Sequence, residues 1–588
     1  MDPDISPLVN ELESIIPTAM SENKINGYSL AIVGSAGRLW SKGYGYADHA
    51  LNSVSSSTLF MIGSLSKAYT VTAFLRAVQA GHVALDDRLI DYYPRFRWKT
   101  RFGDDELGKV TFRHLLTHWA GLQHNANIRL SDGGCCDYPT YMARVKHMWQ
   151  KYPVGTRFSY SNIGFDLVAS ALQEITGMSF EDWMREQVYE PLGMKSTTSA
   201  VKALKGSDVA WGHFGESEFS FEDTITPHIA SGSQYCSVDD MSRFIAMHLN
   251  GGVVDGEKYL DPSLLEEVYT IPYRDEYQLM AIGMGIGVRR FKYNGELFLS
   301  FFGDGPGYLS LHQLFPRLGV GWVMSCNQSM NSFSLLNTIA EKIEAYMVKA
   351  KLGELPPNVN TGDLVPKRES VKVDSITLDR LSGRYVSRMS NINIQQEEGA
   401  LGFQWQGKPC TLKPYSATEY TSETLPLATF DLDETGRPLT VKVLPENGYT
   451  TVLDYDGGPA DPVGPDKPEW SKYLGYYMYD YGVLCWYYSV QVIDGYLVLY
   501  TGRDGFRLQE HEPDLFFTSD NQSVEFTSDA MILPDGVYRR ETPSLETLMD
   551  AKPNDIRLHP SSLNSLIEIL SRTGRVEESE QIKKTFKL

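Results

Sequence analysis

The chain has 588 residues, of which 42% are hydrophobic, and this size and apolar content predict about three or four packed domains. Its formal net charge of −20 disfavours nucleic acid and anionic membranes, so we expect neither as a partner. The sequence has no secretory signal and no run of the ~20 apolar residues that span a bilayer, and its six scattered cysteines are typical of reduced thiols, which together predict a cytoplasmic protein.

The N-terminal part predicts a sheet with helices packed on it. Residues 7–22 carry apolar side chains at helical spacing. Two runs rich in apolar and aromatic residues follow at 28–33 and 39–46, and the Ser35-Ala36-Gly37 turn between them is typical of a β-hairpin. We therefore expect an α/β (α+β) fold in which an antiparallel sheet is flanked by helices.

The segment 60–70 is the strongest candidate for an active centre. An apolar run precedes a helix that is predicted to open at Ser64. Residues three apart share a helix face, so Lys67 would lie beside Ser64 and could take its hydroxyl proton if burial lowers the pKa of the amine. Ser-x-x-Lys also occurs at Ser21 and Ser199, without a comparable helix. The Ser64 helix continues with an apolar stripe formed by Ala68, Val71, Thr72, Leu75 and Val78.

Residues 111–122 contain two histidines one helical turn apart. His114 and His118 could bind a metal ion as a pair, but no third carboxylate or cysteine ligand lies nearby in the sequence. We therefore interpret both as structural histidines and expect no metal site.

A second candidate segment is Tyr160-Ser161-Asn162, which follows a turn and opens a helix that runs to Gly177. A tyrosine phenol can shuttle a proton when a nearby ammonium lowers its pKa, and an asparagine side chain offers a donor and an acceptor to a substrate amide or carbonyl. The alternative is a buried tyrosine next to a helix-capping asparagine. Taken alone, the segment favours that alternative.

Together, Ser64-Leu65-Ser66-Lys67 and Tyr160-Ser161-Asn162 resemble the motifs of the serine β-lactamase and penicillin-binding-protein superfamily. The pattern is most similar to the class C β-lactamase-related branch, which also holds esterases, D-aminopeptidases, transesterases and thioesterases. Residues 115–122 resemble its Leu-Leu-Thr-His-x-Ser-Gly-Leu segment, and residues 232–241 resemble its Gly-Gly…Ser-x-x-Asp-Met/Leu segment. The resemblance extends over residues 8–350.

The resemblance implies a role for each motif residue. Ser64 would be the acylated nucleophile, and Lys67 and Tyr160 would share proton transfer, with the identity of the base left open. Asn162 would bind Lys67 and the acyl-side amide or carbonyl. The backbone N–H groups of Ser64 and of a residue on an edge strand would form the oxyanion hole. These groups supply the chemistry without a metal or organic cofactor, and we expect none.

The third motif departs from the family pattern. Where the family has Lys-Thr-Gly or His-x-Gly, this chain has Phe301-Phe302-Gly303-Asp304, in which Gly303 is retained and Asp304 would supply the backbone N–H. Because the cation that pairs with a substrate carboxylate is missing, recognition of such substrates should weaken. We expect Phe301, Phe302 and Tyr308 to line a cleft for neutral, apolar acyl groups.

The second half of the chain is rich in short strand patterns. We predict a hydrolase domain over 1–352, a linker over 353–376, a β-barrel-like domain over 377–457, a linker over 458–469, a second β-barrel-like domain over 470–545 and a helical tail over 546–588. The Gly-x-Tyr segments that open the two β units lie about 90 residues apart, which is typical of a degenerate repeat. The barrels either cap or dimerise the enzyme, or reach the cleft with a loop; the sequence leaves both readings open.

The sequence therefore predicts a serine hydrolase that forms an acyl-enzyme on Ser64 and cleaves an ester, amide or thioester of a small, neutral acyl or peptide-like substrate. One alternative is an acyltransferase or transesterase, which passes the acyl group to an alcohol or amine. Another is a binding scaffold that has kept the fold without turnover. Assembly into a homo-oligomer is left open.

Overall fold

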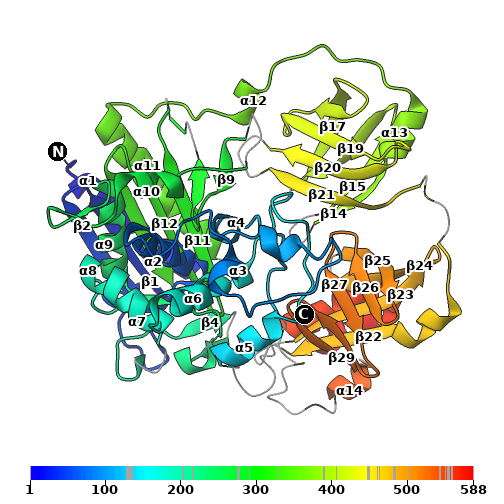
Figure 1. The fold of residues 1–588 in the computed structure, drawn as a ribbon, viewed down its shortest axis with the longest axis horizontal. Coiled ribbons are helices and arrows are strands. Elements are labelled where there is room, and N and C mark those ends of the chain that lie inside the picture. Colours follow the sequence, from blue (N-terminus) through cyan, green and yellow to red (C-terminus); the bar gives the residue numbers. More distant parts are fainter. Residues whose placement is uncertain are drawn as a thin grey trace. The chain divides into compact units, whose positions relative to one another are not determined.

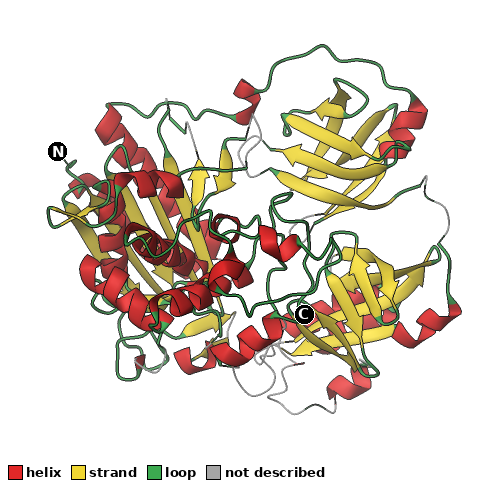
Figure 2. Cartoon of the chain, in the orientation of Figure 1, coloured by secondary structure: helices red, strands yellow, loops and turns green. Residues whose placement is uncertain are grey.

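The fold is described from a computed structural model (Figure 1). The structure describes residues 2–586 except for 127–136, 201–203, 215–216, 225, 274–277, 290–291, 294, 330–331, 388–390, 406, 446–449, 460, 462–463, 481–484, 502–503, 542–543, 550, 552–556 and 558–559. Two compact units make up the chain, the first taking in most of the residues up to Val359 and the second running from Asn360 onwards. Figure 2 shows a mixed helical and β first unit and a second unit that consists mainly of strands.

A seven-stranded antiparallel sheet forms the centre of the first unit, in the order β2-β1-β13-β12-β11-β10-β9. The strands are β1 (Gly27–Gly34), β2 (Gly37–Gly45), β9 (Met280–Ile282), β10 (Gly287–Arg289), β11 (Phe298–Gly305), β12 (Tyr308–Phe315) and β13 (Val320–Cys326). The predicted hairpin β1–β2 pairs with β13, with Tyr28 opposite Cys326. Both β1 and β13 are buried along their whole length, which explains why they read as continuous apolar runs rather than alternating ones.

Helices cover both faces of this sheet. On one face, α1 (Ser6–Glu22) and α11 (Ser332–Leu352) pack over alternate residues of β1 and β13 to form a large apolar cluster. On the other face, α9 (Val238–Leu249) approaches so closely that a Cβ at Gly321 would lie 2.8 Å from the Ile245 side chain. The period-2 alternation of a strand supplies side chains to both layers, as the sequence predicted.

The remaining helices of the first unit lie between β2 and β9 in the chain. They are α2 (Ser66–Gln79), α3 (Leu89–Tyr92), α4 (Phe112–Leu116), α5 (Tyr138–Val145), α6 (Asn162–Thr176), α7 (Phe180–Met184), α8 (Glu190–Leu192) and α10 (Pro262–Val268). Short two-stranded pairs join β3 (Phe60–Met61) to β6 (Tyr235–Cys236), β4 (Gly212–Phe214) to β5 (Ser217–Phe219) and β7 (Val253–Val254) to β8 (Glu257–Lys258). The indole of Trp183 donates to the Ala73 carbonyl over 3.1 Å and so ties α7 to α2.

The second unit contains two closed eight-stranded barrels. After α12 (Thr361–Leu364) and α13 (Ser375–Leu381), the first barrel comprises β14 (Gly383–Val386), β15 (Asn391–Glu397), β16 (Ala400–Trp405), β17 (Lys408–Pro414), β18 (Glu419–Thr421), β19 (Leu427–Leu432), β20 (Pro438–Leu444) and β21 (Thr451–Gly457). The second comprises β22 (Gly475–Asp480), β23 (Cys485–Ile493), β24 (Tyr496–Thr501), β25 (Asp504–Glu512), β26 (Leu515–Thr518), β27 (Ser523–Phe526), β28 (Ala530–Leu533) and β29 (Gly536–Glu541).

The two barrels begin in the same way. Each first strand opens with a glycine in the positive-φ region, Gly383 at φ 152° and Gly475 at φ 145°. Two residues later a buried tyrosine donates to the carbonyl four residues before it, Tyr385 to Leu381 over 2.8 Å and Tyr477 to Tyr473 over 2.6 Å. The predicted pair of barrel domains is confirmed, and the Gly-x-Tyr segments open equivalent strands.

A short helical tail closes the chain. After α14 (Leu545–Met549), α15 (Pro560–Arg572) and α16 (Val576–Phe586) form a hairpin around Gly574, which adopts φ 85°. The apolar face of this hairpin packs on β23 of the second barrel. Among the described residues, Cys236, Cys326, Cys410 and Cys485 are buried free thiols, whereas Cys135 and Cys136 lie outside the described part. None of the described helices combines the length and apolar character that crossing a membrane requires.

Candidate active site

Ser64 lies in a tight turn that precedes a buried helix. The 3-10 turn Gly63–Leu65 comes first and α2 begins at Ser66, two residues later than the sequence predicted. Gly63 adopts φ +52°, and a Cβ there would lie 2.5 Å from the Asp304 carbonyl. The turn therefore needs glycine, because β11 passes directly against the backbone beside Ser64.

Lys67 is fully buried, and three groups surround its amine. The Nζ atom lies 3.0 Å from Ser64 Oγ, 2.7 Å from Asn162 Oδ1 and 2.7 Å from the Ser231 carbonyl oxygen. The latter two are acceptors and take two of the amine hydrogens. In a neutral amine the lone pair is then left for the Ser64 hydroxyl proton.

The electrostatics of the site favour that neutral amine near pH 7. Burial lowers the pKa of Lys67 to about 7, and the negative charge of Asp166 opposes this shift. A base whose pKa is close to neutral is half deprotonated there and still accepts a proton well. The amine also lies over the rings of Tyr160 and Phe165, with Nζ 4.9 Å and 5.7 Å from their centroids.

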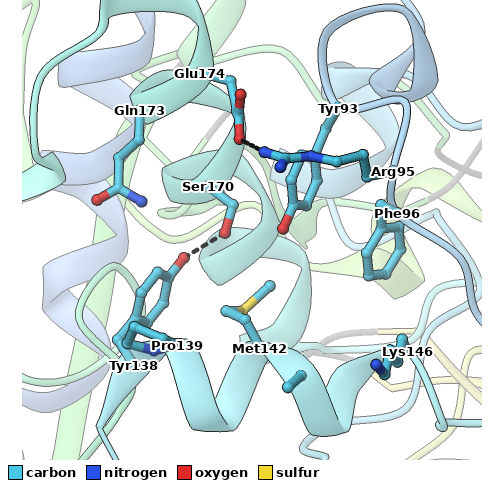
Figure 3. A pocket seen from close by; sticks show the side chains of 11 residues that line it. Tyr93, Arg95, Phe96, Tyr138, Pro139, Met142, Lys146, Ser170, Gln173 and Glu174 are labelled. Carbon is cyan, nitrogen blue, oxygen red and sulfur yellow. Dashed lines mark hydrogen bonds and ion pairs between the residues drawn. The ribbon is translucent and has the colours of Figure 1, made fainter.

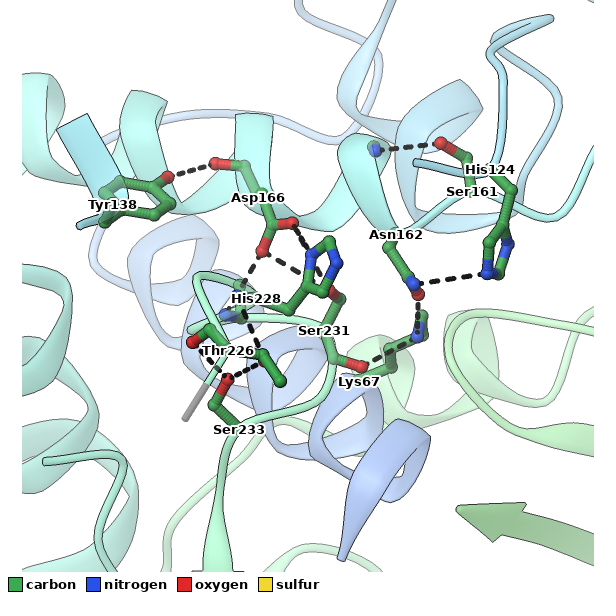
Figure 4. Close-up of polar contacts among 12 residues, drawn as sticks. Lys67, His124, Tyr138, Ser161, Asn162, Asp166, Thr226, His228, Ser231 and Ser233 are labelled. Atoms are coloured by element: carbon green, nitrogen blue, oxygen red, sulfur yellow. Dashed lines mark hydrogen bonds and ion pairs between the residues drawn. The ribbon is translucent and has the colours of Figure 1, made fainter. Parts of the chain in front are cut away.

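The segment 118–124 supports Tyr160 and Asn162. The ring of His118 stacks on the Tyr160 ring at 4.3 Å, and its Nδ1 accepts from the Ser161 N–H over 3.1 Å. The Asn162 amide nitrogen lies 3.4 Å from His124 Nε2, and the Asn162 backbone N–H donates to the His124 carbonyl over 2.9 Å. These contacts aim the Asn162 oxygen at Lys67 (Figure 4).

Both histidines of segment 111–122 have protein contacts. His114 forms a capping box with Thr111 at the start of α4. Burial and the nearby Lys67 amine hold the pKa of His118 well below its usual range, so its ring is neutral. The two side chains therefore act in the structure as a helix cap and as a support for the Tyr160 ring.

Helix α6 carries Asn162 because its start is capped. Ser161 accepts from the Gly164 N–H and donates to the Gln123 carbonyl over 2.7 Å, which fixes the first turn. The helix ends at Gly177 in the left-handed conformation, as the sequence predicted. Residues four apart share a face, so Asp166 lies one turn below Asn162 toward the same side.

Strand β11 borders the site through its backbone. A Cβ at Gly303 would lie 1.8 Å from the Ile62 carbonyl and 2.8 Å from the Leu65 nitrogen, so only glycine permits this approach. The main chain of Asp304 lies against Gly63. The N–H groups of Ser64 and Asp304 thus belong to two segments in direct contact, and an oxyanion hole needs two N–H donors directed at one point.

The side chains of the third motif point in different directions. Strand alternation places Phe302 and Asp304 on the face opposite Gly303. Phe302 is 47% exposed and contacts the Phe333 ring, whereas Phe301 is buried. The Asp304 residue reaches solvent. The protein around its carboxyl nevertheless excludes enough water to raise the pKa of that carboxyl to about 6. No basic side chain occurs among 301–304.

Tyr308 packs into an apolar cluster of the core. It is fully buried in an apolar cluster with Phe60, Met61 and Tyr235, and its hydroxyl donates to the Ala210 carbonyl over 2.8 Å. Its ring therefore packs in the core against β3, whereas the sequence analysis expected it to line the cleft.

A hollow of about 550 Å³ lies farther along α6, beside Ser170, Gln173 and Glu174 (Figure 3). Its wall includes Tyr138 and Ser170, whose hydroxyls lie 2.8 Å apart, and the ion pair between Arg95 and Glu174. None of its lining residues is Ser64, Lys67, Tyr160 or Asn162. The candidate nucleophile Ser64 and the groups around it therefore lie outside this hollow.

Three contacts of the site were missed by the sequence reasoning. The Ser231 carbonyl accepts from the Lys67 amine, the charge of Asp166 acts on that amine, and the His228 ring lies 2.9 Å from the Asp166 carboxylate. A contact made by a backbone carbonyl cannot be predicted from residue identity, because every residue has that carbonyl. The available signal was an acidic residue one helical turn after Asn162, within a helix that is mostly apolar from 163 to 172.

Comparison with known proteins agrees with this geometry. The family profile described as Beta-lactamase matches residues 12–343, which is more than half of the chain. The chain belongs to the beta-lactamase family. Its predicted superfamily and its fold, a mixed helix-and-sheet domain followed by two barrels and a helical tail, are both confirmed.

The relatives within the beta-lactamase family are distant. Penicillin-binding protein 4 of Amycolatopsis lactamdurans is 27% identical over 277 residues, covering 45% of this chain and 71% of that protein. Unguisins hydrolase ungD' of Aspergillus campestris is 27% identical over 227 residues, which are 35% of this chain and 40% of that protein. The crystal structure of SurE superposes with a TM-score of 0.53 at 18% identity, over 76% of this chain and 98% of that one, and this likeness shows the fold alone.

Proposed function

We propose that this beta-lactamase-family protein is a serine hydrolase that forms an acyl-enzyme on Ser64. The observation that carries the proposal is the 3.0 Å contact between the Ser64 hydroxyl and the buried Lys67 amine, whose pKa is about 7. A serine hydroxyl is a weak nucleophile, and an adjacent neutral amine activates it by taking its proton. The family membership and the hydrolase and penicillin-binding names of its relatives support the same class of reaction.

The proposed reaction has two stages. Ser64 Oγ attacks the substrate carbonyl while its proton moves to Lys67, with the Tyr160 phenol sharing the transfer. The carbonyl electron pair becomes an oxyanion that accepts hydrogen bonds from the N–H groups of Ser64 and Asp304. The bond to the leaving group then breaks and that group takes the proton. Water repeats the sequence on the acyl-enzyme and releases the acid.

The substrate class follows from β11. The residues at 301–304 offer no cation to a substrate carboxylate, and Phe301, which shares a face of β11 with Gly303, presents an apolar ring at the motif position of that cation. We therefore propose a neutral ester, amide or thioester of a small acyl or peptide-like group as substrate. A matched pair of a carboxylate substrate and its methyl ester tests this, and equal turnover of the two would count against it.

Labelling of Ser64 tests the reaction class. The purified protein is incubated with a fluorophosphonate probe, and intact-mass analysis is expected to show one adduct that is lost in Ser64→Ala. Ser21→Ala is the matched control, because it removes the serine of another Ser-x-x-Lys pattern, on the surface of α1, and should keep the adduct. Absence of any adduct on the wild-type protein would support a scaffold without turnover. Product analysis with added alcohols or amines then separates hydrolysis from acyl transfer.

A further inference from the structure

A buried carboxylate beneath Lys67 takes no part in the reaction steps above. Asp166 of α6 is 0% exposed. Its oxygens accept from His228 Nδ1 at 2.9 Å, from Ser231 Oγ at 3.3 Å and from the Ala230 N–H at 3.4 Å (Figure 4). All three donors belong to the segment 228–231. An acidic side chain is rarely buried without such partners, so this carboxylate organises the segment around itself.

The backbone carbonyls of the same segment accept hydrogen bonds from side chains of α2. The Ser231 carbonyl accepts from Lys67 Nζ over 2.7 Å, and the Ala230 carbonyl accepts from Thr70 Oγ1 over 2.7 Å. The donors of the segment thus face Asp166, and its acceptors face the helix that carries the amine. We propose that Asp166 is a positioning residue, which through segment 228–231 fixes the carbonyl that holds the Lys67 amine on Ser64. This inference rests on the proposed function.

Charge gives Asp166 a second effect on the same amine. Among the described residues, the titratable side chains that interact with Lys67 are Asp166, His118 and Tyr160. Two further titratable side chains contact the neighbours of Lys67: His124 contacts Asn162, and His228 contacts Asp166. The neutral ring of His118 adds no charge. The carboxylate of Asp166 raises the pKa of Lys67 and so counteracts the lowering that burial causes.

The sign of the pH effect follows from this balance. Lys67 acts as a base only when it is neutral, so the labelling rate rises as pH passes upward through its pKa of about 7. Removing the charge of Asp166 takes away the contribution that raises this pKa. The rise in rate should then occur at lower pH, although the maximum rate falls because the amine is held less firmly. A residue with a merely structural role would not move the midpoint.

The experiment is the pH profile of fluorophosphonate labelling at Ser64 in Asp166→Asn. We expect a maximum rate on the order of ten-fold lower, as for the loss of a hydrogen-bonded charge, and a midpoint shifted to lower pH. The matched control is Asp240→Asn in α9, a buried aspartate whose carboxylate accepts from the Ser196 N–H over 2.8 Å and from Thr197 Oγ1 over 2.9 Å. That variant should lose stability and keep the wild-type midpoint.

A second variant keeps the proposal testable if Asp166→Asn does not fold. Thr70→Val removes the hydroxyl that holds the Ala230 carbonyl while it preserves side-chain shape. We expect a labelling rate several-fold below wild type and an unchanged midpoint, because no charge is altered. Wild-type rates and midpoints in the folded variants would overturn the inference, as would a slower Asp166→Asn whose midpoint equals that of Asp240→Asn. If the wild-type protein itself fails to label, the proposed function is at fault.

Discussion

The two sides of the candidate site are built by different means. On the helix side, the side chains of Ser64 and Asn162 and the carbonyl of Ser231 surround the Lys67 amine of α2 with directed hydrogen bonds. On the strand side, Gly303 and the main chain of Asp304 come close to Gly63, and no basic side chain takes part. The first side therefore depends on chemical groups, and the second depends on backbone shape. This difference predicts which substitutions each side tolerates.

The largest effect is expected on the helix side, at the amine itself. Lys67→Met keeps an unbranched side chain but removes the base, so labelling of Ser64 should fall by about a thousand-fold, within the range of general-base contributions. Initial labelling rates measured by intact mass check this. Lys42→Met is the control, because Lys42 forms a surface ion pair with Glu13 and should label normally. A Lys67→Met rate within about ten-fold of wild type would exclude the amine as the principal base.

On the strand side, added volume should be the damaging change. In Gly303→Ala the new methyl would lie 1.8 Å from the Ile62 carbonyl, so β11 must shift away from the turn that carries Ser64. Loss of one oxyanion donor typically lowers the rate by about a hundred-fold or more, and labelling should fall accordingly.

A matched control separates this local effect from a general penalty for replacing a strand glycine. Gly402 lies in β16 of the first barrel, where the nearest atom to a new Cβ would be the Cys410 carbonyl at 3.7 Å, an ordinary contact. Gly402→Ala should label at the wild-type rate. Equal labelling of Gly303→Ala and wild type would show that the contact between β11 and Gly63 does not shape the site.

The pH dependence of Ser64 labelling in the wild-type protein tests whether the Lys67 amine on the helix side is neutral near pH 7. Because burial lowers the pKa of Lys67 to about 7, the amine is neutral above that pH and protonated below it. Labelling should therefore lose about ten-fold for each pH unit below the midpoint and level off above it. Spontaneous hydrolysis of the probe at each pH is the control. A midpoint near the ordinary lysine value, about 10.4, would show that the amine is not desolvated in solution.

The sequence predicted the residues that carry a recognisable pattern. Ser64 and Lys67 were predicted from their helical spacing and Asn162 from the family resemblance, and the structure places the Lys67 amine within hydrogen-bond distance of the other two. The two barrels were predicted from repeated Gly-x-Tyr segments, since a strand that must start with an unusual backbone angle keeps its glycine. Patterns that arise from local geometry are visible in a sequence because the residues concerned are close together in the chain.

The contacts that the sequence did not predict join distant segments. The Ser231 carbonyl bonds Lys67 across 164 positions and uses an atom that every residue has. Asp166 is one of 74 acidic residues, and only its burial distinguishes it from the solvated ones. Tyr308 illustrates the converse: its position after a glycine-rich turn suggested a cleft wall, whereas the register of β12 points its ring into the core.

The smallest expected effect concerns specificity on the strand side. Phe301 occupies the motif position at which a cation would pair with a substrate carboxylate, and it lies on the same face of β11 as Gly303. Phe301→Lys should raise turnover of a carboxylate substrate relative to its methyl ester by roughly ten-fold, because an ion pair shielded from solvent contributes about 1–2 kcal/mol. Steady-state rates for the matched substrate pair provide the ratio.

The neighbouring position supplies the control for that change. Phe302 points to the opposite face of the sheet, is 47% exposed and contacts the ring of Phe333, so Phe302→Lys adds the same charge away from the nucleophile. It should leave the substrate ratio within about two-fold of wild type, as expected for a solvent-screened charge. If both variants changed the ratio equally, general charge would explain the preference. If neither did, selection between the two substrates would arise outside β11, and the missing cation would have no bearing on it.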